Sequence, residues 1–343
     1  MASNALTYSS GAQALPAHKH GTDAWLIERG NTIGASEIGM VIGVSPYGGL
    51  LDLVTRKRAA LAGNVEQFDS PAMADGRDAE ETILRMARRR INMPHLKFRQ
   101  GEAVAVGRAS ATPDAILVDD DGLVVALVEA KLDRSRTDWS AVADGNFADV
   151  SWTSNDLRLA YYWQVQQQLR VTGCASGWLA VWTVYDFFLI YIEADPEAAR
   201  IIDESVAAAW KWVKNARGLL PDPTDADSIA SIAATVKPKS EEARQVEGDL
   251  ADSIERYAAI NAQIAELERE QDSIKRGLLV AHNDATALVT AGGFKSTFVA
   301  ATSRRSVDTK RLQAERPEVA EEFTRTTEVS AGCRVTAPRA KKV

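Results

Sequence analysis

Ala111–Lys131, ATPDAILVDDDGLVVALVEAK, is the stretch that decides the fold of this 343-residue chain. Two short apolar runs, Ile116–Val118 and Leu123–Val128, flank an acidic turn that ends in Asp-Gly, and this pattern predicts a β-hairpin. Asp114 precedes the first run, and the second run leads into Glu129-Ala130-Lys131. The glutamate and the lysine are two positions apart, so their side chains leave the same face of a strand. Two carboxylates and a lysine can therefore meet at one spot, as a hard cation and a hydrolytic site require.

Composition indicates a soluble protein with room for about two domains. The chain is 45% hydrophobic and 25% charged, and no apolar run is long enough to span a membrane. Met1–Lys19 lacks the basic-then-apolar pattern of a secretory signal, and Cys174 and Cys333 form no metal-ligand spacing, so we expect a cytoplasmic protein without a disulfide. The net charge of −7 argues against a uniformly basic surface but leaves room for a local basic groove.

The segments upstream of the hairpin carry two further candidates. Ser36 is placed to cap a short helix over Glu37–Ile42, just after Arg29, which fits either a capped surface helix or a phosphate-binding helix start. Pro71–Arg90 predicts a helix whose arginine-rich end complements the helix dipole or faces DNA. Within that helix, Glu80 and Glu81 cannot be separated by local pattern.

Downstream, the pattern alternates between helix and strand. A long polar loop over 133–152 precedes a helix over Asn155–Val171, where an apolar stripe and a cluster of glutamines share neighbouring faces. The aromatic residues of this helix fit a core better than a base-stacking platform. Further elements are expected as a strand pair over 96–99 and 102–106, strands over 177–183 and 187–193, and a helix over 195–216. This order predicts an α/β (α+β) fold with a central mixed sheet flanked by helices.

The C-terminal third differs in composition. A Pro-, Asp- and Ser-rich stretch over 219–240 reads as a linker, and 241–283 reads as one long helix with a seven-residue apolar repeat. One heptad position holds Leu250, Tyr257, Ile264, Gln271 and Leu278, and the other holds Val246, Ser253, Ile260, Leu267 and Ile274. Another subunit or the chain itself could cover this stripe. Residues 284–343 are expected to form a small β-containing module, with a strand over 294–300, Arg304-Arg305, a short helix after Asp308 and a basic tail.

Four motifs in order give the chain a family resemblance over about residues 23–215. They are the segment from Arg29 through Ser36 to Tyr47, the run Gly76-Arg77-Asp78-Ala79-Glu80, Thr112-Pro113-Asp114 with Glu129-Ala130-Lys131, and Tyr162-Trp163-Gln164-Val165-Gln166. Together they resemble the phage YqaJ/lambda-exonuclease family of alkaline 5′→3′ exonucleases, in the PD-(D/E)xK (restriction-endonuclease-like) superfamily. The resemblance implies a nuclease domain over 23–218, preceded by an arm over 1–22.

The resemblance also implies site roles. Asp114, Glu129, Glu80 and the Ala130 carbonyl would hold Mg²⁺, which Mn²⁺ could replace, and the spacing from Gly76 selects Glu80 over Glu81. Lys131 would position the attacking water and stabilise charge, with Gln164 behind it; the two nearby carboxylates oppose a role as free base. Arg29, Ser36 and Thr112 would bind the terminal 5′-phosphate, although the family carries serine where this chain has Thr112.

By the same resemblance, the expected function is metal-dependent 5′→3′ digestion of double-stranded DNA ends, leaving 3′ single-stranded overhangs for phage-type recombination in a bacterial host. The expected partners are double-stranded DNA ends, a single-strand annealing protein and further copies of the chain in a ring such as a trimer. A PD-(D/E)xK endonuclease and a catalytically inert DNA-end-binding or assembly protein that uses the coiled coil are the alternatives.

Overall fold

The computed structural model describes residues 6–19, 21–65, 70–135, 137–147, 156–183, 185–215, 218–236, 244–283, 285–300 and 309–322. The chain divides into two compact units, Met1–Val236 and Lys237–Val343. Among the described helices, none combines the length and the apolar character that crossing a bilayer demands.

A mixed five-stranded sheet forms the centre of the first unit, with strand order β3-β6-β7-β8-β9. The strands are β3 Lys97–Gln100, β6 Ala115–Val118, β7 Val124–Leu132, β8 Ser176–Trp182 and β9 Phe187–Glu193. β6 and β7 form the predicted hairpin, and its turn closes because the Asp119 carboxylate accepts the backbone N–H groups of Asp121 and Leu123. The β7–β8 pair is parallel and the other three pairs are antiparallel. The predicted α/β fold with a central mixed sheet is confirmed.

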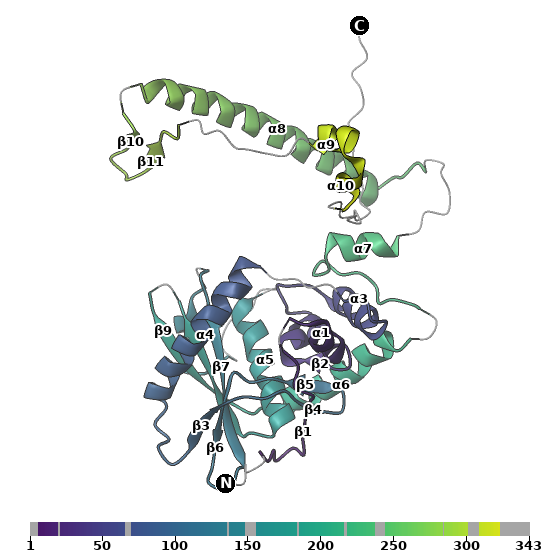
Figure 1. Ribbon diagram of the computed structural model, residues 1–343, viewed down its shortest axis with the longest axis vertical. Coiled ribbons are helices and arrows are strands. Elements are labelled where there is room, and N and C mark those ends of the chain that lie inside the picture. The colour runs from purple at the N-terminus through teal and green to yellow at the C-terminus, as the bar shows by residue number, and fades with distance from the viewer. Residues whose placement is uncertain are drawn as a thin grey trace. The chain divides into compact units, whose positions relative to one another are not determined.

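Helices cover both faces of this sheet (Figure 1). α4, Pro71–Arg90, packs on one face through Ile83 and Ala87, against alternate strand residues such as Leu117 and Val128. The opposite face packs against α5, Leu157–Thr172. Because side chains alternate across a strand, Glu129 and Lys131 of β7 lie on the α5 face. The helix that begins at Pro71 has the predicted bounds.

A second, four-stranded sheet has the order β1-β4-β5-β2 and brings the N-terminal segment beside the hairpin. Its strands are β1 Gln13–Ala14, β4 Val104–Val106, β5 Ala109–Ala111 and β2 Ile33–Gly34. The prediction that 96–99 and 102–106 pair with each other is wrong, since β3 pairs with β6 and β4 pairs with β1 and β5. Gly101 separates them: a β-carbon there would overlap the Pro113 carbonyl, so the chain passes close to the start of β6 instead of turning back.

The remaining helices of the first unit are α1 Asp23–Arg29, α2 Ile38–Ile42, α3 Leu50–Leu61, α6 Pro196–Val213 and α7 Ile229–Thr235. α7 lies within the stretch expected to be a linker, and it is held against α3. The Ser228 hydroxyl donates to the Asp52 carboxylate over 2.7 Å, and the Asp227 carboxylate accepts the Asp52 backbone N–H over 3.0 Å. The first unit therefore extends through this segment.

The second unit is built on α8, Asp249–Ala281, which is 33 residues long. The helix was expected from residue 241, but Val246 lies before it in non-helical backbone. β10 Ala287–Val289 pairs antiparallel with β11 Lys295–Thr297, within the expected strand over 294–300, and β10 was not predicted. The expected short helix after Asp308 is α9, Thr309–Glu315, followed by α10, Pro317–Glu322. Arg304-Arg305 and the basic tail lie outside the described residues.

Candidate functional site

The candidate site lies where β7 continues past the end of its neighbour β6. The β6–β7 register ends at the pair Ala115 and Val128, whereas the β7–β8 register continues to Leu132. Asp114, just before β6, fills the place of the missing neighbour: its Oδ2 accepts the Ala130 backbone N–H over 2.7 Å. We call this place beside β7, where Asp114 stands next to Glu129, Ala130 and Lys131, the notch. The N–H and C=O of one strand residue point to the same edge, so the Ala130 carbonyl faces the notch as well.

Glu129 is the most enclosed carboxylate of the notch, with 2% of its surface exposed. Its Oε1 accepts the Gln164 amide over 2.5 Å and lies 2.6 Å from Lys131 Nζ. Its Oε2 accepts the amide of Gln168 over 2.6 Å. A carboxylate offers about four lone-pair positions, so these three contacts leave one open on Oε2.

Gln168 is a site residue that the sequence interpretation did not assign. The i, i+4 spacing of Gln164 and Gln168 places both amides on one side of α5, and this spacing is the signal that could have found it. The Oε1 of Gln168 is buried without a hydrogen-bond partner among the described residues. Two neutral amides thus hold one carboxylate in a fixed orientation.

Lys131 lies between Glu129 and an aromatic ring. Its Nζ is 4.9 Å from the centre of the Tyr161 ring, and that ring stacks on Trp139 at a centroid distance of 6.0 Å. Burial alone would lower the pKa of Lys131, but Glu129, Tyr161 and Asp114 together outweigh burial and raise it. The lysine therefore stays a cation at neutral pH.

Glu80 reaches the same region from α4, on the other side of the sheet. Burial and the charge of Glu129 raise its pKa, and Lys131 partly opposes this. Glu80 is half-buried whereas Glu81 is exposed. The fold thus separates the two glutamates that local pattern could not separate.

The carboxylates of the notch repel one another. Burial, followed by the charge of Glu129, raises the pKa of Asp114 well above its usual range, while Lys131 and the Ala130 N–H pull it down. In the part of the chain that the structure describes, no three His, Cys, Asp or Glu side chains are already gathered closely enough to hold a metal ion. The donor chemistry nevertheless fits Mg²⁺, because the groups are all oxygen donors and a divalent cation would relieve their repulsion.

The predicted phosphate-binding residues meet at a second place. Arg29 ends α1, and its guanidinium donates to the Ser36 hydroxyl over 3.3 Å. Ser36 and Thr112 each lie two residues beyond the last register pair of β2 and β5, Gly34 with Ser110, and Thr112 is exposed. Ser36 and Thr112 therefore follow adjoining strand ends, and Arg29 reaches Ser36 from the end of α1.

Ser36 does not cap the helix as the sequence suggested. It lies inside a 3₁₀ turn, Ala35–Glu37, that runs into α2, and the Glu37 carboxylate accepts the Gly34 backbone N–H over 2.8 Å. Lys57 Nζ lies 2.6 Å from the same Oε2 of Glu37 and holds this carboxylate in place. This leaves the Ser36 hydroxyl free of a capping role and directed to Arg29.

Gln167 links β2 and β5 to α5. Its buried amide donates to the Ile33 and Ser110 carbonyls over 2.8 and 3.0 Å, one on β2 and one on β5. Sequence interpretation did not assign this role, because both partners are remote in the chain. One helix, α5, therefore holds the notch through Gln164 and Gln168 and the strand ends through Gln167.

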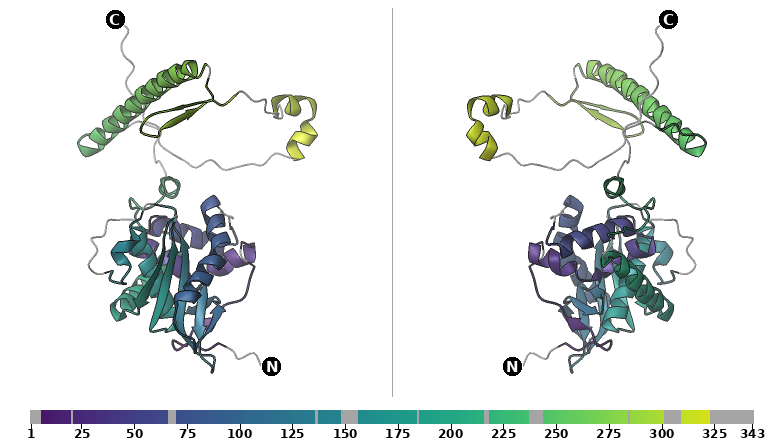
Figure 2. Two further views of the ribbon diagram at one scale, coloured as in Figure 1. Left: turned by 90° about the vertical axis from the view of Figure 1, so that its left-hand side faces the viewer. Right: turned by 90° about the vertical axis from the view of Figure 1, so that its right-hand side faces the viewer.

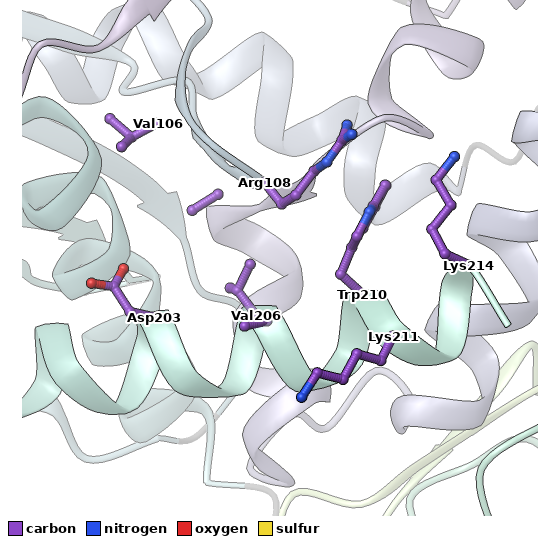
Figure 3. A pocket seen from close by; sticks show the side chains of 9 residues that line it. Val106, Arg108, Asp203, Val206, Trp210, Lys211 and Lys214 are labelled. Carbon is purple, nitrogen blue, oxygen red and sulfur yellow. The ribbon is translucent and has the colours of Figure 1, made fainter.

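Two hollows lie beside these residues. A cavity of about 430 Å³ lies between the β4–β5 turn and α6, and Trp210 is one of the residues that line it. Figure 3 shows Arg108 and Lys214 beside the Trp210 ring. None of the predicted site residues lines it. A smaller hollow of about 370 Å³ is lined by Ala79 and Leu132, the sequence neighbours of Glu80 and Lys131.

Comparison with known proteins gives a family match and several similar structures. An alkaline exonuclease from Laribacter hongkongensis is 18% identical, with 57% of this chain and 93% of that chain covered at a TM-score of 0.42. A phage-related exonuclease from Haemophilus somnus is 12% identical, with 55% and 95% covered at a TM-score of 0.39. No curated protein matches the chain significantly.

The family match covers the notch and the adjoining strand ends. Residues 24–175 match the model described as YqaJ-like viral recombinase domain, and this range includes Arg29, Ser36, Glu80 and the hairpin through to Gln168. This match confirms, over residues 24–175, the resemblance that the four motifs predicted.

Proposed function

We propose that this chain is a metal-dependent 5′→3′ exonuclease that acts on double-stranded DNA ends and leaves 3′ single-stranded overhangs. The observation that carries the proposal is the notch beside β7, where Asp114, Glu129 and Lys131 converge while α5 fixes the orientation of Glu129. The family match supports a role in viral recombination, for which such overhangs are the substrate of strand annealing.

In this mechanism, Asp114, Glu129, Glu80 and the Ala130 carbonyl would hold Mg²⁺, with Mn²⁺ as a substitute. When bound, the ion supplies Lewis-acid polarisation of the phosphate and a more acidic water. Glu129 presents one open lone-pair position because Gln164, Gln168 and Lys131 occupy the other three. The neighbouring carboxylates raise the pKa of Lys131, and this direction favours a lysine that orients the water and offsets negative charge on the phosphorane over one that accepts a proton.

The polarity of the reaction would come from Arg29, Ser36 and Thr112. A guanidinium and two hydroxyls suit a terminal 5′-phosphate, because a monoester carries more charge and more acceptor oxygens than an internal diester. Glu37 lies behind Arg29 at 3.9 Å, so the arginine is held by a charge on one side and offers its other donors to the phosphate. The 3′ strand left behind would pass to a single-strand annealing protein, the partner that we propose for this chain.

The test is digestion of linear duplex DNA with 5′-phosphate or 5′-hydroxyl ends, beside closed circular duplex DNA. We expect Mg²⁺-dependent loss of the 5′-phosphorylated strand, slower attack on 5′-hydroxyl ends and intact circles. Degradation of circles would show a PD-(D/E)xK endonuclease instead.

Asp114→Asn distinguishes an enzyme from an inert DNA-end-binding protein. We expect it to reduce nuclease activity by at least about 10²-fold, since it removes a charge that stabilises the reacting groups. Asp120→Asn is the matched control, because that turn carboxylate is 88% exposed and pairs only with Lys97 among the described residues. Equal activity in the two variants would contradict the assigned site.

A further inference from the structure

α8 presents an apolar face that no described element of its unit can cover. Every residue of this helix is exposed except Ala251 and Ala258, which are half-buried. The exposed residues include large apolar side chains in the heptad positions, such as Tyr257, Ile264 and Leu267. Figure 2 shows α8 as one uninterrupted helix in both views.

The length of the face restricts what can cover it. The heptad core from Leu250 to Ile274 spans about 36 Å at 1.5 Å per residue. The other described elements of the unit, β10, β11, α9 and α10, are three to seven residues long. A second helix of equal length would cover the whole face, and another copy of α8 is such a helix.

The positions of the two polar interruptions indicate the direction of pairing. In an antiparallel pair, the core position that holds Leu250 and Gln271 in one copy packs against the core position that holds Ser253 and Ile274 in the other. A register centred on residue 262 then places Gln271 opposite Ser253 of the second copy. The same register matches every other core layer with an apolar partner: Leu250 with Ile274, Tyr257 with Leu267, and Ile260 with Ile264. A parallel pair would instead stack two Tyr257 side chains in one layer and two small Ser253 side chains in another.

Charge complementarity agrees with this register. Residues that flank the antiparallel core on one side bring Arg256 opposite Glu270 of the second copy, twice by symmetry. In a parallel pair, Arg256 would face Asn261, and Glu270 would face Lys275. No like-charged pair arises in either register, so the charges permit both directions and the match of the core layers decides between them.

We propose that α8 is a self-association element, through which two copies of this chain pair antiparallel over Leu250–Ile274. This pairing is independent of the proposed nuclease reaction. It joins two nuclease domains, or two assemblies of them, by their C-terminal units.

Crosslinking through single cysteines tests the arrangement in the full chain. In a Cys333→Ser background, Gln263→Cys places a thiol beside its own counterpart in the antiparallel register, whereas Leu267→Cys does so only in a parallel pair. Ala262→Cys is the control, since its heptad position faces away from the core. With a short bismaleimide, we expect a covalent dimer from Gln263→Cys alone. A dimer from Leu267→Cys only, or from none of the three, would overturn the proposal.

Charge reversal gives an independent readout. Arg256→Glu or Glu270→Arg alone should reduce the number of copies in the particle, measured by light scattering, and the double variant should restore it. Failure of the double variant to restore pairing would contradict the Arg256–Glu270 contact. Nuclease activity of the single variants reports separately on the proposed function.

Discussion

Gln168 shows how one buried amide can position a carboxylate. Its amide donates to Oε2 of Glu129, whereas its own Oε1 is buried without a hydrogen-bond partner among the described residues. An unsatisfied buried acceptor costs stability, so the contact with Glu129 comes with an energetic cost. Loss of a partner behind a metal ligand lowers activity and metal affinity. We therefore expect Gln168→Leu to lower nuclease turnover about 10- to 100-fold and to raise the Mg²⁺ concentration that gives half the maximal rate. A Mg²⁺ titration of single-turnover rates measures both.

The control for Gln168 is Gln166→Leu. Gln166 is also buried on α5, but its amide donates to the Glu193 carbonyl, away from the notch. That variant should lose stability while its Mg²⁺ dependence stays unchanged. If both variants shift the Mg²⁺ dependence equally, Gln168 acts only by holding the helix.

Glu80 and Glu81 form a second matched pair at the residue scale. Glu80 is half-buried and interacts with the charge of Glu129, whereas Glu81 is exposed on the next position of α4. We expect Glu80→Gln to reduce cleavage about 10²-fold and Glu81→Gln to change it less than about threefold, because only the first carboxylate faces the notch. Rates on a 5′-phosphorylated duplex measure the difference, and equal losses would remove Glu80 from the site.

At the scale of elements, α1, α3 and the 3₁₀ turn are joined by one buried ion pair. Lys57 Nζ of α3 donates to the Arg29 carbonyl over 2.6 Å and lies 2.6 Å from Glu37 Oε2. Burial would raise the pKa of Glu37, but Lys57, Arg29 and Arg56 outweigh it and hold the pKa at about 2. This pKa lies below that of the unfolded chain, so the ionised carboxylate stabilises the fold above about pH 4.5.

We therefore expect the stabilisation from Glu37 to disappear as the pH falls from about 4.5 to about 2. A shift of that size corresponds to about 3 kcal/mol, at about 1.4 kcal/mol per unit. Urea unfolding of the wild-type chain and of Glu37→Gln should differ by about this amount at pH 7 and converge near pH 2. Glu204→Gln, at an exposed carboxylate, is the control. A difference that persists to pH 2 would exclude the charge of Glu37 as its source.

The elements that sequence predicts well are those whose signals are local. The β6–β7 hairpin follows from an Asp-Gly turn between two apolar runs, and α4 from Ser70-Pro71 and its apolar spacing. β5, with the sequence Ala-Ser-Ala, lacks the β-branched residues that mark a strand. The buried glutamines of α5 have partners 27 to 134 residues away, so no local pattern reveals them. Site residues were predictable where a family motif named them, and Gln167 and Gln168 were not.

At the scale of the whole molecule, the end of the first unit can be decided by truncation. Composition placed the domain end at residue 218, whereas α7 is held on α3 by contacts from Asp227 and Ser228 to Asp52. Removing α7 takes these hydrogen bonds from Asp52 and lets water replace them, which costs about 0.5–1.5 kcal/mol for each bond.

A chain that ends at Leu220 should therefore melt several degrees below one that ends at Val236, by about 2–4 °C for each kcal/mol in a unit of this size. Thermal unfolding followed by circular dichroism measures the gap. Asp52→Asn in the longer chain is the matched variant, because it keeps α7 but weakens the same contacts, and it should fall between the two. If the two truncations melt together, α7 contributes nothing to the nuclease unit. If the longer one keeps full nuclease activity but loses the pairing through α8, catalysis and pairing reside in separate units of the chain, as we propose.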